Sequence, residues 1–181
     1  CQHQGRYFQL SDVMGVDREM GFSLSTDKYN TCDPHHFILE DIDTAVDFGE
    51  GTSRIYAQGK HYQILAQDGE YSQLVVNEYG KGHSVYFAGL PYSPQNCRIL
   101  LRAIYYAAGM PEEMKHYYVT NVDTEVTVFP ETKRIAVINN ADAEEKTDLY
   151  IKGHLIDSLP HQHLKLDRDF CIHASCQVSS L

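Results

Sequence analysis

The sequence predicts an α/β layer followed by a small antiparallel β-sandwich, and three stretches support this fold class. In residues 79–109 (YGKGHSVYFAGLPYSPQNCRILLRAIYYAAG), a glycine turn leads into a buried strand, a loop and a helix. Residues 55–86 contain short β-favouring runs separated by glycines, a spacing typical of sheet. Residues 112–181 contain further short runs and turns without a long helical period, which favours a sandwich. We therefore expect two domains, residues 1–111 and residues 112–181.

The first domain is expected to begin with a short helix and a short strand. Apolar residues from Tyr7 to Met14 recur at helical spacing and predict an amphipathic helix that ends at Gly15. The residues that follow, 17–21 (DREMG), are interpreted as a turn, and the apolar run Phe37–Leu39 predicts a strand. Four more strands are predicted over β-favouring runs, at residues 54–57, 62–66, 74–77 and 84–88.

The helix after the last of these strands has clear boundary signals. Ser93 is a suitable N-cap, Pro94 suits the first helical position, and Gly109 supplies a stop. The loop 89–92 lies at the carboxyl end of a strand, which is where open α/β sheets bind ligands. Tyr92 and Ser93 are therefore candidate substrate-binding residues. The alternative, that Ser93 only caps the helix and Tyr92 only packs, stays open.

The second domain is predicted to consist of short strands and tight turns. The stretch Pro111–Glu113 marks the change of domain, because it follows the glycine stop. The tail from Asp169 fits no period and is expected to be irregular. Strands are predicted at residues 125–129, 133–138, 147–151, 155–156 and 164–166.

Composition and charge argue against several classes of function. The 181 residues carry 25 acidic and 15 basic side chains, and the net charge of −10 argues against nucleic acid or an anionic membrane as a partner. No apolar run approaches the roughly 20 residues that span a bilayer. No secretory signal is visible, and five cysteines without a CxxC pair predict reduced thiols in the cytoplasm. Because no initiator methionine is present, we expect the chain to be part of a longer protein.

The residue types that usually carry chemistry form no recognisable motif. The pair His35–His36 lies near Asp41 and Asp43, but adjacent side chains on a strand point to opposite faces, so polar loop residues are expected here. The acidic run 40–47 is interpreted as a solvated face. No nucleophile elbow is present, and Gly80–Gly82 precedes a strand, whereas phosphate loops follow one. We therefore predict no catalytic residue, no metal ion and no cofactor on this chain.

Four stretches of the chain resemble a known enzyme family. They are residues 8–30 (FQLSDVMGVDREMGFSLSTDKYN), 36–41 (HFILED), 79–109 and 125–140 (EVTVFPETKRIAVINN). Together they resemble the galactosyl phosphorylases that act on lacto-N-biose, galacto-N-biose and galactosyl-rhamnose. The GLPYS segment and the helix that follows it are the most specific part of this resemblance.

The resemblance implies an identity for each domain. In that family a large barrel comes first and carries the general acid, a middle domain resembles glutamine amidotransferases without their triad, and a β-sandwich follows. Residues 1–111 would be the second half of the amidotransferase-like (flavodoxin-like) α/β domain, and residues 112–181 would be the sandwich. His83 stands where the family pattern GKGRSVY has an arginine.

The resemblance also implies a function. In the family reaction, phosphate attacks the anomeric carbon with inversion and releases α-galactose 1-phosphate and the acceptor sugar, without a metal. The chain would be a non-catalytic C-terminal portion, inactive alone, that packs on the barrel, closes the sugar site and supports a homodimer. Inorganic phosphate and a galactosyl disaccharide would bind to the full-length enzyme. Two alternatives are a trimerisation or carbohydrate-binding module of a β-galactosidase-like enzyme and an amidotransferase-like enzyme.

Overall fold

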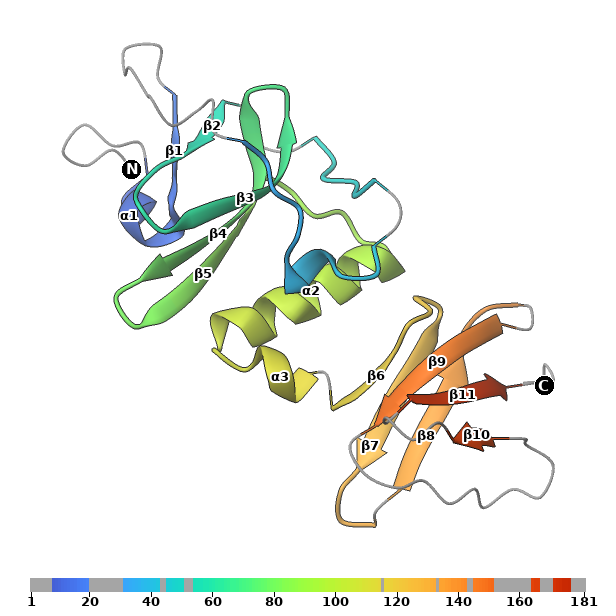
Figure 1. Ribbon diagram of the computed structural model, residues 1–181. Coiled ribbons are helices and arrows are strands. Elements are labelled where there is room, and N and C mark those ends of the chain that lie inside the picture. The colour runs from blue at the N-terminus through green and yellow to red at the C-terminus, as the bar shows by residue number, and fades with distance from the viewer. Residues whose placement is uncertain are drawn as a thin grey trace. The chain divides into compact units, whose positions relative to one another are not determined.

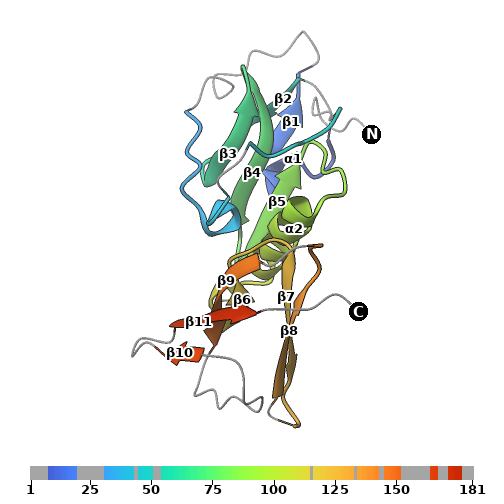
Figure 2. The same cartoon turned by 90° about the vertical axis from the view of Figure 1, so that its right-hand side faces the viewer.

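The computed structural model divides into two compact units, Cys1–Met110 (unit 1) and Pro111–Leu181 (unit 2). Figure 1 and Figure 2 show that most of the regular structure is β-strand and that one helix, α2, is much longer than the others. No helix among the described residues is long and apolar enough to cross a membrane. The structure describes residues 8–19, 31–42, 45–50, 54–114, 116–132, 134–142, 145–151, 164–166 and 171–176.

Unit 1 contains two small antiparallel sheets. Strand β1 (Val16–Arg18) pairs with β2 (Ile55–Ala57), and β3 (Tyr62–Asp68), β4 (Tyr71–Tyr79) and β5 (Gly82–Phe87) form a three-stranded meander. Positive-φ glycines lie in the two tight turns of the meander, which is why each strand returns beside the previous one. The predicted helix before Gly15 is confirmed as α1 (Ser11–Met14), although it begins only at Ser11.

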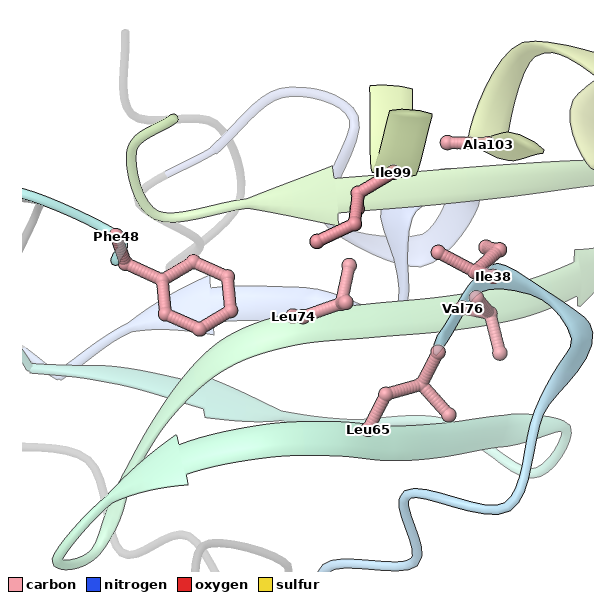
Figure 3. Packing of buried hydrophobic residues seen from close by; sticks show 7 residues of the cluster. All are labelled: Ile38, Phe48, Leu65, Leu74, Val76, Ile99 and Ala103. Atoms are coloured by element: carbon pink, nitrogen blue, oxygen red, sulfur yellow. The ribbon is translucent and has the colours of Figure 1, made fainter. Parts of the chain in front are cut away.

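Helix α2 (Pro94–Ala107) covers one face of the meander. Ser93 caps it and Pro94 occupies its first turn, so these two boundary signals are confirmed. Ile99 and Ala103 point from α2 toward the strands (Figure 3), and the cluster that they join is the larger hydrophobic core of unit 1. The buried members of this core are Ile38, Phe48, Leu65, Leu74, Val76, Ile99 and Ala103.

The predicted flavodoxin-like α/β layer is wrong. Such a layer needs parallel strands, and each parallel connection needs a crossover of a dozen or more residues. Here β3, β4 and β5 are joined by turns at Gly69 and Gly80, and every pairing among the described strands is antiparallel. The loop 89–92 therefore follows an edge strand of an antiparallel meander, so the argument from a parallel sheet does not apply to it.

Two local predictions in unit 1 are also wrong. Phe37–Leu39 forms a 3₁₀ helix, η1, because the His36 side chain accepts a hydrogen bond from the Ile38 amide at 3.2 Å and caps the turn. Residues 17–18, interpreted as part of a turn, belong to β1, where Asp17 pairs with Tyr56 of β2. Both errors concern segments of three residues, too short to show a period in the sequence.

Unit 2 begins with α3 (Pro111–Met114) and continues as antiparallel strands. Its strands are β6 (Tyr117–Val119), β7 (Thr124–Phe129), β8 (Arg134–Asn139), β9 (Glu145–Ile151), β10 (Leu164–Leu166) and β11 (Cys171–Cys176). One sheet has the order β10-β11-β9-β6, and β7 pairs with β8. A buried cluster of Val119, Leu149 and Ile151 packs against apolar residues of β7 and β8.

Most predicted strands of unit 2 correspond to observed ones. The runs 125–129, 133–138, 147–151 and 164–166 coincide with β7, β8, β9 and β10 to within a few residues. The tail was expected to be irregular, but Cys171–Cys176 forms β11 and pairs with β9 along six residues. The predicted strand at 155–156 lies outside the described residues.

Candidate functional site

Ser93 holds the first turn of α2. Its Oγ atom accepts a hydrogen bond from the Asn96 amide at 3.0 Å, and its carbonyl accepts one from the Cys97 amide at 2.9 Å. Pro94 has no amide hydrogen to offer. The amides of Asn96 and Cys97 therefore already have an acceptor in Ser93. Ser93 thus has a structural role whether or not it also touches a ligand.

Asn96 fixes the loop that precedes the helix. This side chain is 2% exposed, and its Nδ2 atom donates to the carbonyls of Asp47 and Pro91 at 2.9 and 2.7 Å. The Asp47 carboxylate in turn accepts from the Gly49 amide at 2.7 Å. A Cβ atom on Gly49, which has φ of 61°, would lie 3.4 Å from the Pro91 ring. The two loops that meet at Asn96 are therefore closely packed and hydrogen-bonded.

Tyr92 lies on this fixed loop and is 91% exposed. Tyr92 therefore does not pack against the described residues of unit 1. Because Asn96 and Ser93 hold the backbone of this loop, binding through Tyr92 would restrict mainly its side-chain torsions and little of the backbone. Such a ring can stack on a sugar or on a side chain of a partner, and its hydroxyl can donate or accept a hydrogen bond.

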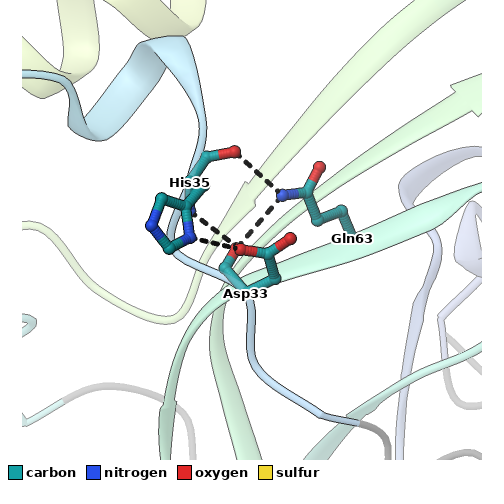
Figure 4. Close-up of polar contacts among 3 residues, drawn as sticks. All are labelled: Asp33, His35 and Gln63. Atoms are coloured by element: carbon teal, nitrogen blue, oxygen red, sulfur yellow. Dashed lines mark hydrogen bonds and ion pairs between the residues drawn. The ribbon is translucent and has the colours of Figure 1, made fainter.

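A polar cluster holds residues 33–35 on β3 (Figure 4). The Asp33 carboxylate accepts from the His35 amide at 3.1 Å and from the His35 ring at 2.9 Å. Gln63 of β3 donates its Nε2 hydrogens to the carbonyls of Asp33 and His35 at 3.1 and 3.3 Å. The His35 amide, and then its ring, hold the pKa of Asp33 below its ordinary value. These contacts explain the shape of the loop without any catalytic task.

His36 has partners other than that cluster. Its ring lies edge-on against Tyr106 of α2, with centroids 4.8 Å apart, and His83 of β5 lies 4.9 Å from the same tyrosine. Burial lowers the pKa of His36. Burial, with a smaller effect of the Glu78 charge, raises the pKa of Tyr106. The two adjacent histidines thus serve two separate contacts, and Asp43 lies outside the described residues.

A buried arginine anchors the residues after η1. Arg102 of α2 is 1% exposed, donates through Nη1 to the Glu40 carbonyl, and approaches the Asp41 carboxylate at 3.4 Å. The side chain of Asp41 is 39% exposed, and its backbone takes the left-handed conformation with φ of 62°. The acidic run interpreted as a solvated face therefore also contains an anchor point. Sequence reasoning missed Arg102, because arginine is almost never fully buried unless it is paired.

Three side chains together pin one irregular segment, which we call the 31–50 segment and which the structure describes at 31–42 and 45–50. Gln63 binds the carbonyls of residues 33 and 35, Arg102 binds the carbonyl of residue 40, and Asn96 binds that of residue 47. Carbonyls that lack a strand or helix partner are thus satisfied by side chains. The polar residues of this region hold backbone in place.

Comparison with known protein families supports the resemblance. The model of the lacto-N-biose phosphorylase central domain matches residues 1–112, and that of the lacto-N-biose phosphorylase C-terminal domain matches residues 117–158. The chain belongs to the lacto-N-biose phosphorylase family.

Curated relatives agree with this assignment. A 1,3-beta-galactosyl-N-acetylhexosamine phosphorylase of Lachnoclostridium phytofermentans is 49% identical over 150 residues, which are 83% of this chain and 21% of the relative. An enzyme of the same name from Bifidobacterium longum subsp. longum is 36% identical over 79% of this chain and 23% of its own length. A D-galactosyl-beta-1->4-L-rhamnose phosphorylase of L. phytofermentans is 28% identical, over 81% and 20% respectively. The chain therefore spans about a fifth of the length of these relatives.

Proposed function

We propose that this chain is the non-catalytic C-terminal portion of a galactosyl phosphorylase. The supporting observation is that it matches the central and C-terminal domain models of the family while spanning 21% of a curated relative. The polar side chains Gln63, Asn96 and Arg102 are occupied with holding backbone, which agrees with an accessory role. Residues 1–111 and 112–181 are proposed to be its two domains.

The reaction of the complete enzyme is proposed to be reversible phosphorolysis. Inorganic phosphate would cleave a β-galactosyl-N-acetylhexosamine, or galactosyl-rhamnose, to α-galactose 1-phosphate and the acceptor sugar. The acid that protonates the leaving oxygen would come from the remaining part of the enzyme, and no metal or cofactor would be needed. The free thiols Cys32 and Cys97 agree with a cytoplasmic location, and the net charge of −10 agrees with partners other than nucleic acid or membranes. A homodimer is the proposed assembly.

Within that enzyme, Tyr92 and Ser93 are proposed to border the sugar site, with Tyr92 making the contact and Ser93 positioning it. The exposed ring on a rigid loop supports this role. We expect Tyr92→Ala in the active enzyme to raise KM about 10-fold for the disaccharide, equivalent to about 1.4 kcal/mol. Tyr79→Ala, which removes another exposed tyrosine (55% exposed), is the matched control and should leave KM unchanged. Equal effects of the two exchanges would contradict the proposed contact.

A segment exchange tests the function itself. The matching fifth of the L. phytofermentans enzyme that is 49% identical can be replaced by this chain, and release of galactose 1-phosphate from lacto-N-biose is then measured. We expect the chimera to retain phosphorolysis and the isolated 181-residue chain to show none. A folded chimera without activity, or activity of the isolated chain, would overturn the proposal.

A further inference from the structure

Helix η1 is capped by a histidine ring instead of one of the usual oxygen acceptors. The Ile38 amide donates a hydrogen bond to His36 Nδ1 at 3.2 Å. A backbone amide is always the donor, so Nδ1 must present a lone pair and the ring must carry its proton on Nε2. The serine, threonine, asparagine or aspartate of an ordinary cap accepts without depending on a ring tautomer. This cap therefore exists while His36 is neutral.

Protonation of the ring turns the acceptor into a donor. In the imidazolium both ring nitrogens carry hydrogen, so Nδ1–H would face the Ile38 N–H and the hydrogen bond would be lost. Ile38 is 0% exposed in the larger core of unit 1, so water does not reach its amide while η1 is closed. A buried donor without a partner is unfavourable, and opening of the turn would give this amide access to water.

The surroundings of the His36 ring keep it neutral at neutral pH. Its ring lies edge-on against Tyr106 of α2, with centroids 4.8 Å apart, and burial lowers its pKa. Burial also raises the pKa of Tyr106, so this phenol stays uncharged over the same pH range. Other charged or titratable groups that act on η1, its flanking residues or Tyr106 include Asp33, His35, Asp41, Glu78, His83 and Arg102.

The carboxylates in this set have neighbours other than His36. Asp33 accepts from the ring of His35, and Arg102 approaches the Asp41 carboxylate at 3.4 Å. Glu78 of β4 lies opposite His83 of β5 in the register of the two strands. Burial is therefore the effect that sets the pKa of His36, and the neutral ring is the form that fits the closed turn.

Hydrogen bonds on both sides of η1 limit how far an opening would spread. Gln63 binds the carbonyls of residues 33 and 35 before η1, and Arg102 binds the carbonyl of residue 40 after it. The amide and guanidinium groups of these donors do not titrate near neutral pH. We infer that His36 is a pH-sensitive switch: the neutral ring holds η1 closed, and protonation of the ring opens residues 36–39 between the two fixed flanks. This inference does not rest on the proposed function.

Hydrogen exchange of the 181-residue chain, followed by mass spectrometry on peptides that cover residues 36–42, tests the switch. Protection is calculated relative to the intrinsic exchange rate, which removes the chemical effect of pH. From about pH 7.5 to about pH 5.5 we expect the protection of the η1 peptide to fall about 10-fold or more, because a buried amide loses its acceptor. Peptides from β4 report the stability of the whole unit, and their protection should fall less.

Two exchanges at position 36 separate the cap from the charge. His36→Asn keeps an acceptor that does not titrate, so the η1 peptide should stay protected at both pH values. His36→Ala removes the acceptor, so the peptide should be as weakly protected at about pH 7.5 as the wild type is at about pH 5.5. His35→Asn is the matched control, because His35 is the adjacent histidine, its side chain is 93% exposed, and its ring pairs with Asp33. This control should keep the wild-type response.

Each result decides the inference. Protection of the η1 peptide that does not change with pH, or that changes no more than in β4, overturns the switch. A response that persists in His36→Asn overturns it as well. His83→Gln removes the second histidine at Tyr106 and should keep the response, whereas loss of the response would assign the titration to His83 and overturn the role of His36. None of these readouts involves phosphorolysis, so they are independent of the chimera experiment.

Discussion

Replacing Asn96 with aspartate sets two physical effects against each other. Asn96 lies in the first turn of α2, where the helix dipole usually stabilises a negative charge by about 0.3–1 kcal/mol. Here, however, its Nδ2 atom donates to the carbonyls of Asp47 and Pro91. Aspartate would replace that donor with a carboxylate oxygen that faces two carbonyl oxygens. The helix rule therefore predicts stabilisation, and the contacts predict the opposite.

The contacts should outweigh the dipole. An acceptor that loses its partner costs about 1–3 kcal/mol where water cannot reach it, and Asn96→Asp removes the donor from two carbonyls. Asp47 and Pro91 are exposed residues, so water offsets part of this cost, but the new carboxylate at position 96, which is 2% exposed, faces both oxygens. After subtraction of the dipole term, we expect the free energy of unfolding to fall by about 1–3 kcal/mol. Burial disfavours the charged form of the new carboxyl, so this loss should shrink as the pH falls and the group takes up a proton.

Urea unfolding followed by far-UV circular dichroism measures this loss, since α2 is the longest helix among the described residues. Ser93→Asp is the matched control. It adds the same charge at the same helix end, but aspartate at the N-cap can still accept from the Asn96 amide, so stability should change by less than about 0.5 kcal/mol. The reasoning is refuted if Asn96→Asp is as stable as wild type or more stable.

Two further predictions concern unit 1. Gly15→Ala should lower the free energy of unfolding by about 1–3 kcal/mol in the same assay, because Gly15 has φ of 67° and an added Cβ would lie 2.7 Å from Asn77 Cβ. Gly69→Ala is the control: Gly69 has φ of 58° but no atom near an added Cβ, so this exchange should lower the free energy of unfolding by less. Burial lowers the pKa of His36, so its protonation should destabilise unit 1 as the pH falls below about 6.5 and contribute nothing above that value. His36→Asn should flatten the urea midpoint between about pH 5 and 7, and an unchanged slope would contradict this role.

Local signals predicted the parts of the fold that depend on a few neighbouring residues. Ser93 and Pro94 mark the start of α2 because capping and a fixed proline φ act within one turn. Gly69 and Gly80 mark the two turns of the meander for a similar reason, since each has a positive φ. The helix and the hairpins therefore follow directly from the sequence.

Strand direction could not be read in the same way. A strand, a loop and a helix in series occur in parallel α/β sheets and also after the last strand of a meander, so residues 79–109 fit both. The choice depends on which strand lies beside β5, and that strand is β4, whose pairing runs from Leu74–Phe87 to Tyr79–Gly82. The turn at Gly80 was the relevant signal, because two residues cannot form a parallel crossover.

In the candidate site, only contacts between residues close in the sequence could be predicted. Ser93 was identified as a cap from its position alone, and the structure confirms that role. Asn96 gave no such signal, because its partner carbonyl at Asp47 lies 49 residues earlier in the chain. Tyr92 could have been buried or exposed, since an aromatic residue in a loop occurs in both environments, and only the structure gives its exposure.

The long-range contacts that sequence reasoning missed also explain why this region holds its shape. The 31–50 segment contains only one turn of 3₁₀ helix among its described residues, so its backbone lacks the repeating hydrogen bonds of a helix or sheet. Gln63, Asn96 and Arg102 donate to its carbonyls instead, from β3 and α2. A catalytic donor must exchange partners during a reaction, whereas these three are occupied in the folded protein. Of the three, Asn96 also donates to the Pro91 carbonyl and so holds the loop that carries Tyr92, whereas Gln63 and Arg102 hold only the 31–50 segment.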